Sequence, residues 1–175
     1  MTARPYLVNP LVAKQMDTSL DEYLADGLLQ HSTSPYASSA VIIPKKSSGI
    51  LLTINNKKLI NISILGELPI PRVDHILDKL GSVRIFSLFD LVSSFYQITV
   101  HKDRIPLTAF CTTTGLFEWL VVPQGRSAAP GWFVKVMNEV IKGIAHVAAY
   151  LDYVVVFDPD PSAHVFPIQR LFKQL

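Results

Sequence analysis

The sequence predicts an α+β domain in which amphipathic helices alternate with short strands. Two patterns support this prediction: apolar residues that recur every three or four positions, and brief apolar runs that end at turn-forming residues. The length agrees with it, because 175 residues suffice for one domain or for a compact part of a larger one. Periodicity alone leaves an α/β arrangement open as well.

Helical periodicity recurs in four segments and is clearest near the N-terminus. There an apolar residue occupies every fourth position from Val12 to Leu28, and Gly27 is the expected stop. Pro71 and Pro130 stand where two later helices should begin, since proline is well tolerated in a first helical turn. Helices are expected at Val12–Leu28, Arg72–Leu80, Pro130–Ile144 and Ala163–Leu175.

Strand-like runs fill most of the remaining sequence. The segment from Lys45 to Gly49 separates two of them, which predicts a β-hairpin with a basic tip. Another run ends at Asp90, and the breaker Asp158–Pro161 follows the last run. Strands are expected at Ala40–Pro44, Ile50–Ile54, Val83–Phe89, Phe95–Val100, Leu107–Thr112, Leu116–Val122, Val147–Leu151 and Val154–Phe157.

The composition is apolar for a folded domain. Hydrophobic residues make up 49% of the chain and charged residues 17%, which is below the usual share of about a quarter. Such an excess suggests that some apolar surface meets a partner or another domain. The net charge of +2, from 16 basic and 14 acidic residues, gives only weak support for nucleic-acid binding.

Nothing in the sequence indicates export or membrane insertion. The N-terminal segment is broken by Pro5 and Pro10 and lacks the apolar stretch of a signal peptide. The longest apolar run, Val147–Phe157, is interrupted by Asp152 and falls short of the roughly 18 residues that a membrane span needs. A single cysteine, Cys111, excludes an intrachain disulfide. We therefore expect an intracellular protein of the cytoplasm or nucleus that is not secreted.

Two aspartates occupy matching positions beside apolar runs. Asp90 ends the run that begins at Ile85, and Asp152 interrupts the run Val147–Phe157. A carboxylate at the end of a buried strand is costly unless it is paired, exposed at a cleft or bound to metal. On adjacent strands the two side chains would suit Mg²⁺, which prefers oxygen ligands and usually binds through carboxylates and substrate phosphates.

Other interpretations of the acidic and histidine residues stay open. An aspartate in the turn of an apolar hairpin is common, because Asp tolerates turn geometry. The five histidines are scattered without metal-ligand spacing and are interpreted as structural or surface residues. Asp74 and Asp78 are four residues apart on an expected helix, where a solvated face explains them.

Seven segments follow one another in a distinctive order along the chain: Ser32–Ser38, Leu68–Asp74, Phe86–Leu91, Tyr96–Ile98, Thr108–Phe110, Gly115–Pro123 and Tyr150–Asp152. Their order and spacing resemble the reverse transcriptases of gypsy-type long-terminal-repeat retrotransposons. The resemblance runs from about Leu7 to the end of the chain. It implies the right-handed polymerase fold, with fingers and palm subdomains and an antiparallel palm sheet backed by helices.

This resemblance also implies how the chain is organised. Residues 1–175 would form a single reverse transcriptase domain, in which residues 1 to about 89 are largely fingers and about 90 to 175 largely palm. The thumb and ribonuclease H regions are expected to be absent from the chain. A separate partner chain could supply them.

The two aspartates take on catalytic roles if the resemblance holds. Asp90 and Asp152 would be palm aspartates that hold Mg²⁺ for nucleotidyl transfer. The implied partners are an RNA template, a DNA primer and a deoxynucleotide. No membrane partner is implied.

Further residues match the nucleotide- and template-binding positions of the family. Phe95 would be the aromatic gate beneath the incoming sugar, and Gln124 and Gly125 would touch the nucleotide and template. Lys46, together with Lys45, would meet the triphosphate or the template backbone. A core residue of a strand remains the alternative for Phe95, and a solvated hairpin tip remains the alternative for the lysines.

Several charged positions of the family pattern are altered here. Tyr153 stands where the resemblance places a further aspartate after Asp152, and a phenol, neutral near pH 7, cannot replace a carboxylate at a magnesium site. Leu51 and Asn55 stand for an arginine and an aspartate of the fingers, so the forked donors that would clamp a triphosphate are missing. Further departures are Lys57, Ile60 and Ser94.

The apolar framework is retained while these positions change together. Packing depends mainly on pattern and volume, so a fold can persist without its chemistry. We therefore expect an RNA-directed DNA polymerase that is impaired or inactive in this copy. One alternative is a protein-interaction module that exposes apolar surface. The other is a non-catalytic nucleic-acid-binding module that uses Lys45, Lys46, Lys57, Lys58 and Arg72.

Overall fold

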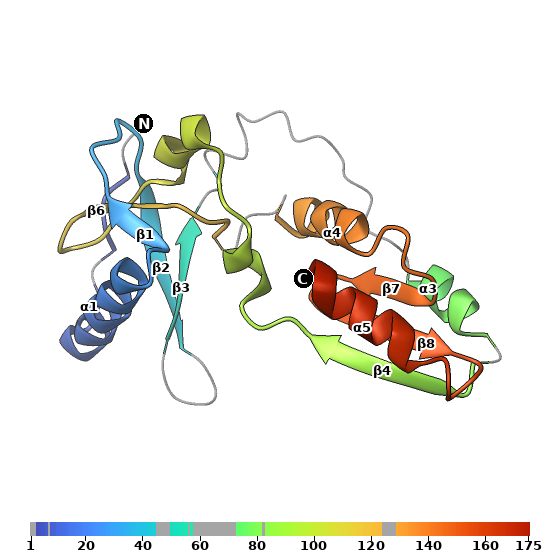
Figure 1. Cartoon of the computed structure of the whole chain (residues 1–175). Helices are drawn as coiled ribbons and strands as arrows, with labels where there is room; N and C mark the ends of the chain where they lie inside the picture. Colours follow the sequence, from blue (N-terminus) through green and yellow to red (C-terminus); the bar gives the residue numbers. More distant parts are fainter. Residues whose placement is uncertain are drawn as a thin grey trace. The chain divides into compact units, whose positions relative to one another are not determined.

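A computed structural model describes residues 3–6, 8–44, 50–55, 57, 73–81, 83–123 and 129–175 (Figure 1). Its contacts divide the chain into two compact units. Unit 1 comprises Met1–Leu65 and Phe95–Ala129, and unit 2 comprises Gly66–Ser94 and Pro130–Leu175. Each unit thus combines two separate stretches of sequence. The expected division into fingers and palm near residue 90 stays a prediction.

The first helix, α1 (Pro10–Ala25), confirms the expected N-terminal helix, although it begins and ends slightly earlier. Pro10 lies in the first turn, where its missing N–H is not needed. Asn9 caps this turn, because its side chain accepts a hydrogen bond from the Leu11 N–H at 2.9 Å. Gly27 follows the helix in the left-handed conformation, with φ 69°, as expected of a helix stop.

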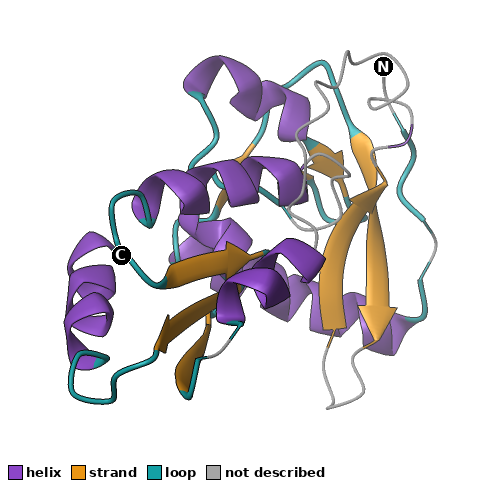
Figure 2. Cartoon of the chain, turned by 90° about the vertical axis from the view of Figure 1, so that its right-hand side faces the viewer, coloured by secondary structure: helices purple, strands orange, loops and turns teal. Residues whose placement is uncertain are grey.

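Unit 1 contains a five-stranded sheet built from β1 (Leu29–His31), β2 (Ser38–Pro44), β3 (Ile50–Asn55), β5 (Phe110–Cys111) and β6 (Leu116–Trp119). The strand order is β1-β6-β5-β2-β3. β2 and β3 form the expected antiparallel hairpin, whose basic tip lies outside the described residues (Figure 2). The remaining pairs are short, and β5 runs parallel to β2.

The expected strand Phe95–Val100 is wrong. The chain forms a 3-10 helix, η1 (Ser94–Gln97), and only Thr99 makes an isolated bridge, to Val121. Ser93 has a φ of 51°, so the backbone turns before the segment starts. Backbone pairing is confined to the end of the segment, where the Val100 N–H donates to the Leu120 carbonyl and the Ile98 carbonyl accepts from the Val122 N–H. Tyr96, in η1, instead packs its ring on Trp119.

The expected strand Leu107–Thr112 is shorter than predicted. A second 3-10 helix, η2 (Lys102–Thr108), takes up its first part and leaves only β5. The buried Thr108 hydroxyl accepts a hydrogen bond from the Trp119 N–H at 2.8 Å. This bond holds the end of η2 against β6.

Unit 1 buries a cluster of aromatic rings between α1 and the sheet. Trp119 is fully buried, and its ring centroid lies 5.3 Å from that of Tyr96, 5.5 Å from Tyr23 and 6.0 Å from Phe110. Burial, together with the neighbouring Tyr23 phenol, raises the pKa of the Tyr96 phenol, which therefore stays protonated. These contacts give unit 1 an enclosed core.

Unit 2 contains, among the described residues, the strands β4 (Ile85–Asp90), β7 (Val147–Tyr150) and β8 (Tyr153–Asp158) and the helices α3 (Val73–Leu80), α4 (Ala129–Val140) and α5 (Val165–Gln174). These elements confirm six expected ones. The strands form an antiparallel sheet in the order β4-β8-β7. α5 lies over one face of this sheet, where Phe172 contacts Phe89 with ring centroids 5.3 Å apart (Figure 1).

A hydrogen-bonded pair fixes the end of β8 that leads to α5. His146 Nδ1 lies 2.8 Å from Asp158 Oδ2, and Asp158 Oδ1 accepts a hydrogen bond from the Asp160 N–H at 3.0 Å. These two bonds lower the pKa of the Asp158 carboxyl, because they stabilise its charged form. Asp158 thereby anchors the connection between strand and helix.

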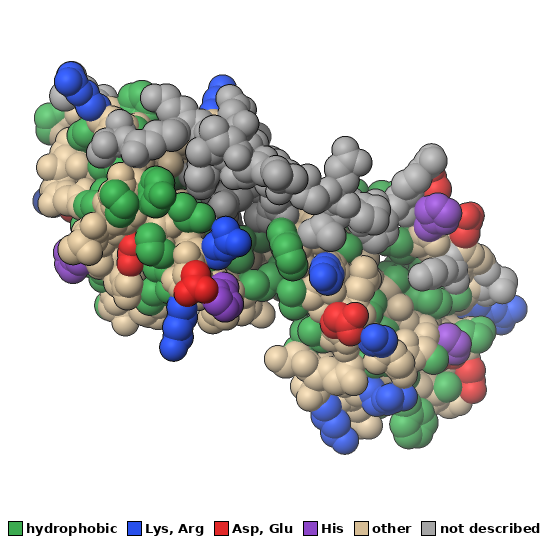
Figure 3. All heavy atoms as spheres, turned by 90° about the horizontal axis from the view of Figure 1, so that it is seen from above, with side chains coloured by type: hydrophobic (Ala, Val, Ile, Leu, Met, Phe, Trp, Pro, Cys, Tyr) green, Lys and Arg blue, Asp and Glu red, His purple; other side chains and the backbone are tan. Residues whose placement is uncertain are grey.

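The surface carries mixed charges and many exposed apolar side chains. On the face in Figure 3, lysine and arginine side chains are interspersed with acidic and apolar ones. Several of the most exposed apolar residues belong to unit 2, with Phe86 and Phe166 both at 68% and Leu88 at 63%. Within the described ranges, no helix is both long and apolar enough to cross a membrane.

Candidate functional site

The two predicted metal ligands, Asp90 and Asp152, lie at the same end of the unit 2 sheet. Asp90 is the last residue of β4, and Asp152 lies in the short turn between β7 and β8. The Leu91 N–H donates a hydrogen bond to the Asp152 carbonyl oxygen at 2.9 Å. Two stretches that are far apart in sequence therefore meet through their backbones.

The turn that carries Asp152 is tight. Tyr150 and Tyr153 are cross-strand partners, which leaves only Leu151 and Asp152 to connect the strands. Leu151 has a φ of 51°, in the left-handed region that a two-residue hairpin turn uses at its first central position. A leucine in this conformation is strained by roughly 1–2 kcal/mol. The paired strands on either side thus fix the position of the Asp152 backbone.

Asp90 faces Tyr153 across the sheet. The two residues are the last cross-strand partners of the β4–β8 ladder, and side chains of such partners lie on the same face. Asp90 is exposed, and Tyr153 is 42% exposed. The altered position identified in the sequence therefore lies directly beside an expected metal ligand.

The described residues offer two carboxylates at this end of the sheet. Mg²⁺ usually binds through one or two carboxylates together with substrate phosphates, and Asp90 and Asp152 suit that donor set. No cluster of three or more His, Cys, Asp or Glu side chains that could hold a metal ion occurs in the part of the chain that the structure describes. The roles of both aspartates as metal ligands and catalytic residues stay predictions.

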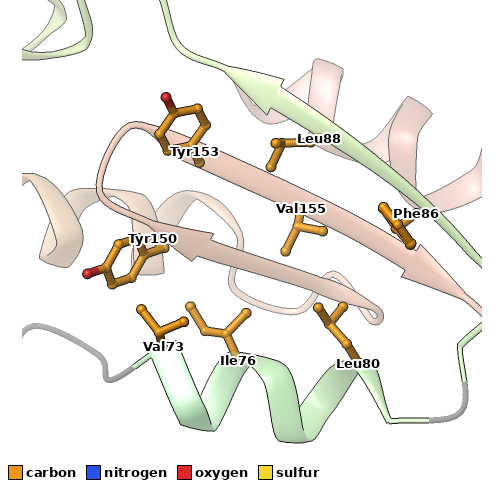
Figure 4. Close-up of a pocket in the computed structure, with 8 residues that line it drawn as sticks. All are labelled: Val73, Ile76, Leu80, Phe86, Leu88, Tyr150, Tyr153 and Val155. Carbon is orange, nitrogen blue, oxygen red and sulfur yellow. The ribbon is translucent and has the colours of Figure 1, made fainter.

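An apolar hollow of about 370 Å³ opens on the face of the sheet that carries Tyr153 (Figure 4). Val73 and Ile76 of α3 form one wall, and Leu88 and Val155 of the sheet form the other (Figure 4). Tyr153 belongs to the same lining. Its ring therefore extends the apolar surface as far as Asp90.

The residues expected to bind nucleotide in the fingers are only partly described. Leu51 is half-buried on β3 opposite Ile43. Asn55 Nδ2 donates a hydrogen bond to the Tyr6 hydroxyl at 3.2 Å, and Asn55 Oδ1 accepts one from the Lys57 N–H at 3.3 Å. Neither side chain supplies a forked cation. Lys45, Lys46, Lys58, Ile60, Arg72, Gln124 and Gly125 lie outside the described residues.

Phe95 is half-buried in η1. Its alternative interpretation as a core residue of a strand is wrong, because η1 replaces that strand. The role of Phe95 as an aromatic gate stays a prediction. The neighbouring Ser94, which departs from the family glycine, is buried at 3% exposure.

Two arrangements of polar side chains were not predicted from the sequence. Glu118 is buried and accepts hydrogen bonds from Gln30 Nε2 and Ser32 Oγ, each at 2.6 Å, which ties β1 to β6. Trp132 on α4 is 53% exposed, and Lys135 Nζ lies 5.1 Å from its ring centroid. Helical spacing places positions 132 and 135 on one face of α4, but the exposure of that face depends on how the helix packs.

The order and geometry of these elements match a known family. The family described as reverse transcriptase (RNA-dependent DNA polymerase) matches residues 15–175. The chain belongs to the reverse transcriptase family. Among its relatives are the retrovirus-related Pol polyproteins from transposons 297 and opus of Drosophila melanogaster, 35% and 32% identical over 168 and 169 residues. These alignments cover 92% and 91% of this reverse transcriptase domain but only 16% of each polyprotein.

Solved reverse transcriptases share the fold of this domain. A foamy viral protease-reverse transcriptase in complex with RNA/DNA hybrid superimposes with a TM-score of 0.88 at 23% identity, over 99% of this chain and 24% of that one. A foamy viral complex with double-stranded DNA gives a TM-score of 0.89 at 22% identity, over 99% of this chain and 31% of the other. The predicted α+β polymerase fold and the retrotransposon-type resemblance are thereby confirmed.

Proposed function

We propose that this reverse transcriptase domain supplies fingers and palm to an RNA-directed DNA polymerase, and that polymerisation is impaired in this copy. One observation carries the proposal: Asp90 is paired across the sheet with Tyr153, next to the turn that holds Asp152. Because the chain spans only 16% of the Pol relatives, the polymerase activity and its RNA template, DNA primer and deoxynucleotide substrates all belong to the proposal.

The proposed impairment follows from charge at the end of the sheet. Bound Mg²⁺ would stabilise the charge that develops on the attacking and leaving oxygens of phosphoryl transfer. Asp90 and Asp152 would hold the cation with their carboxylates, while the neutral phenol of Tyr153 adds no anion beside them. Loss of one positioned electrostatic group typically slows a reaction by about 10²–10³-fold.

A second defect lies in the hairpin of β2 and β3. A leucine at position 51 cannot bind a triphosphate, whereas the planar, forked guanidinium of arginine is suited to it. The two defects act on different parts of the reaction. Position 153 would affect the cation, and position 51 would affect the nucleotide.

Primer extension tests the proposal. The purified chain, with an intact retrotransposon enzyme as reference, is assayed on poly(rA)/oligo(dT) with Mg²⁺ or Mn²⁺. We expect very slow incorporation, a gain on the order of 10²-fold with Tyr153→Asp, and a further gain when Leu51→Arg is added. Tyr153→Phe is the matched control, because it changes the side chain without adding charge, and it should gain nothing.

Two results would contradict the proposal. Incorporation by the unmodified chain at the rate of the intact reference enzyme would show that Tyr153 does not impair it. A Tyr153→Asp chain that binds primer-template in a gel shift but extends no faster would show that this position is not the cause.

Nucleic-acid binding without catalysis is a second candidate function. It is supported by the solved relatives of the same fold, which are described as complexes with RNA/DNA hybrid and with double-stranded DNA. A gel-shift titration at increasing salt tests it, because each phosphate contact adds to the salt dependence of the affinity. Absence of any shift at low salt would remove this function.

A further inference from the structure

Trp132 is an unusual side chain on the exposed side of α4. The neighbouring Phe133 and Met137 point into unit 2 and are each 3% exposed, whereas Trp132 is 53% exposed. The chain has only two tryptophans, and the other, Trp119, is fully buried in the core of unit 1. Since Trp132 contributes so little to the core, packing does not account for a large aromatic ring at this position.

The ring of Trp132 is paired with a cation. Lys135 Nζ lies 5.1 Å from the ring centroid, within the range of a cation–π contact. The next lysine along the chain, Lys142, forms an ion pair with Glu139, with Nζ 3.2 Å from Oε2. Among the described residues, Lys135 has no such acidic partner within 4.0 Å. Trp132 and Lys135 together form what we call the α4 platform, an exposed aromatic ring with an ammonium group over it.

We propose that the α4 platform binds single-stranded nucleic acid, with a base stacked on the ring face of Trp132 that Lys135 does not cover and a phosphate next to Lys135. Stacking on exposed aromatic rings combined with basic side chains is how proteins bind single strands without sequence preference. A duplex hides the faces of its bases inside the helix, so an unpaired template stretch suits the platform better. The inference rests on the proposed nucleic-acid-binding function and adds where, and to which form of nucleic acid, the domain binds.

The unequal exposure of the two tryptophans gives a direct test. When the fluorescence is excited at a wavelength that tyrosine does not absorb, the emission comes from Trp119 and Trp132. Only Trp132 is accessible to a ligand in solvent. Titration of the whole chain with oligo(dT) at low salt should quench part of the fluorescence. Trp132→Phe should remove the quenched component. A blunt-ended DNA hairpin, bound to the same occupancy by anisotropy, should quench clearly less.

Affinity measurements separate stacking from charge. By anisotropy with labelled oligo(dT), Trp132→Ala should weaken binding on the order of tenfold, and Trp132→Phe should restore most of the loss because a ring remains. Lys135→Gln should make the affinity fall less steeply with salt concentration, by the amount that about one phosphate contact contributes to the slope. The matched control is Phe166→Ala on α5, an aromatic residue of 68% exposure, which should leave affinity unchanged.

The outcomes distinguish this inference from the function on which it rests. Unchanged binding by Trp132→Ala, with no quenching, would overturn the α4 platform while leaving nucleic-acid binding elsewhere intact. Equal quenching by the blunt hairpin would overturn the preference for single strands. Absence of binding by the unmodified chain would overturn both. Protection of Trp132 from acrylamide in a self-associated chain without nucleic acid would assign the ring to a protein contact instead.

Discussion

The two units of this reverse transcriptase domain bury their apolar residues in different ways. In unit 1 the side chains of Trp119, Phe110 and Leu52 are at most 1% exposed, so α1 and the sheet enclose a finished core. In unit 2 the sheet is covered on one face, whereas α3 covers only part of the other face and leaves the rest open. Val154 is fully buried, whereas Leu88 is 63% exposed on the opposite side.

This difference shows which surface is available for further contacts. Monomeric proteins rarely expose large contiguous apolar patches, so we expect the exposed apolar side chains of this face to be a contact surface. The end of that face carries Asp90, and Tyr153 belongs to the lining of its hollow. Tyr153 therefore adds its ring to this apolar face directly beside Asp90.

The largest expected effect compares the same truncation in both units. Leu52→Ala should lower the free energy of unfolding by about 2–5 kcal/mol, because it leaves a cavity in a closed core. Leu88→Ala should change it by no more than about 0.5 kcal/mol, because the side chain is largely in solvent. Guanidinium unfolding followed by circular dichroism measures both. Equal losses would show that the face of unit 2 is covered in solution.

A second effect concerns cation binding at the end of the open face. Tyr153→Asp should tighten Mn²⁺ binding on the order of tenfold, because it adds a carboxylate beside Asp90. Asp152→Asn should weaken binding by a comparable factor, and Tyr153→Phe should have no effect. Isothermal titration calorimetry provides the constants. Identical affinities for all four chains would place the cation elsewhere.

A third effect concerns association through the open face. We expect the chain to self-associate at high concentration, because Phe86 and Leu88 expose 68% and 63% of their surface. Leu88→Glu should weaken this association several-fold without unfolding the chain. Sedimentation velocity over a concentration series measures it. The outcome that contradicts the prediction is a monomer at every concentration for both chains.

The smallest expected effect depends on pH. The hydrogen bond from His146 lowers the pKa of the Asp158 carboxyl in the folded chain. The charged carboxylate therefore stabilises the folded state fully above the ordinary carboxyl pKa of 3.8. This contribution to folding is lost as the pH falls below that value and through the lowered pKa of the folded state. Asp158→Asn should therefore lower the melting temperature near neutral pH, and the difference should shrink below pH 3.8. A difference in melting temperature between the two chains that stays constant across the acid range would contradict this account.

The fold was predictable wherever local sequence patterns decide it. The hairpins β2–β3 and β7–β8 followed from apolar runs separated by turn residues, and the helices followed from spacing and proline positions. The 3-10 helix η1 was not predictable in this way, because Tyr96 packs on Trp119, and a contact between distant residues outweighs strand propensity. The parallel pairing of β2 with β5 likewise depends on chain stretches that no local pattern connects.

The candidate site shows the same limit. Asp90 could be placed at the end of one apolar run and Asp152 at the interruption of another, since both breaks are visible in the sequence. The cross-strand partner of Asp90 could not be predicted from the sequence. Its pairing with Tyr153 is set by the register between two strands that are distant in sequence. The α4 platform was missed because Trp132 sits in an apolar helix, where its exposure depends on how the helix packs.

The tight link between β7 and β8 fixes the register of the strands that meet at this site. The turn has only two residues, which is the usual length of a tight hairpin turn, and the strands on both sides are paired without interruption. If the turn keeps two residues, an insertion or deletion of one residue in β8 beside it shifts the register and turns Val154 and Val156 from the covered face to the open one. A change of a single side chain, at position 153 for instance, leaves this register intact, whereas a change in the length of the chain does not.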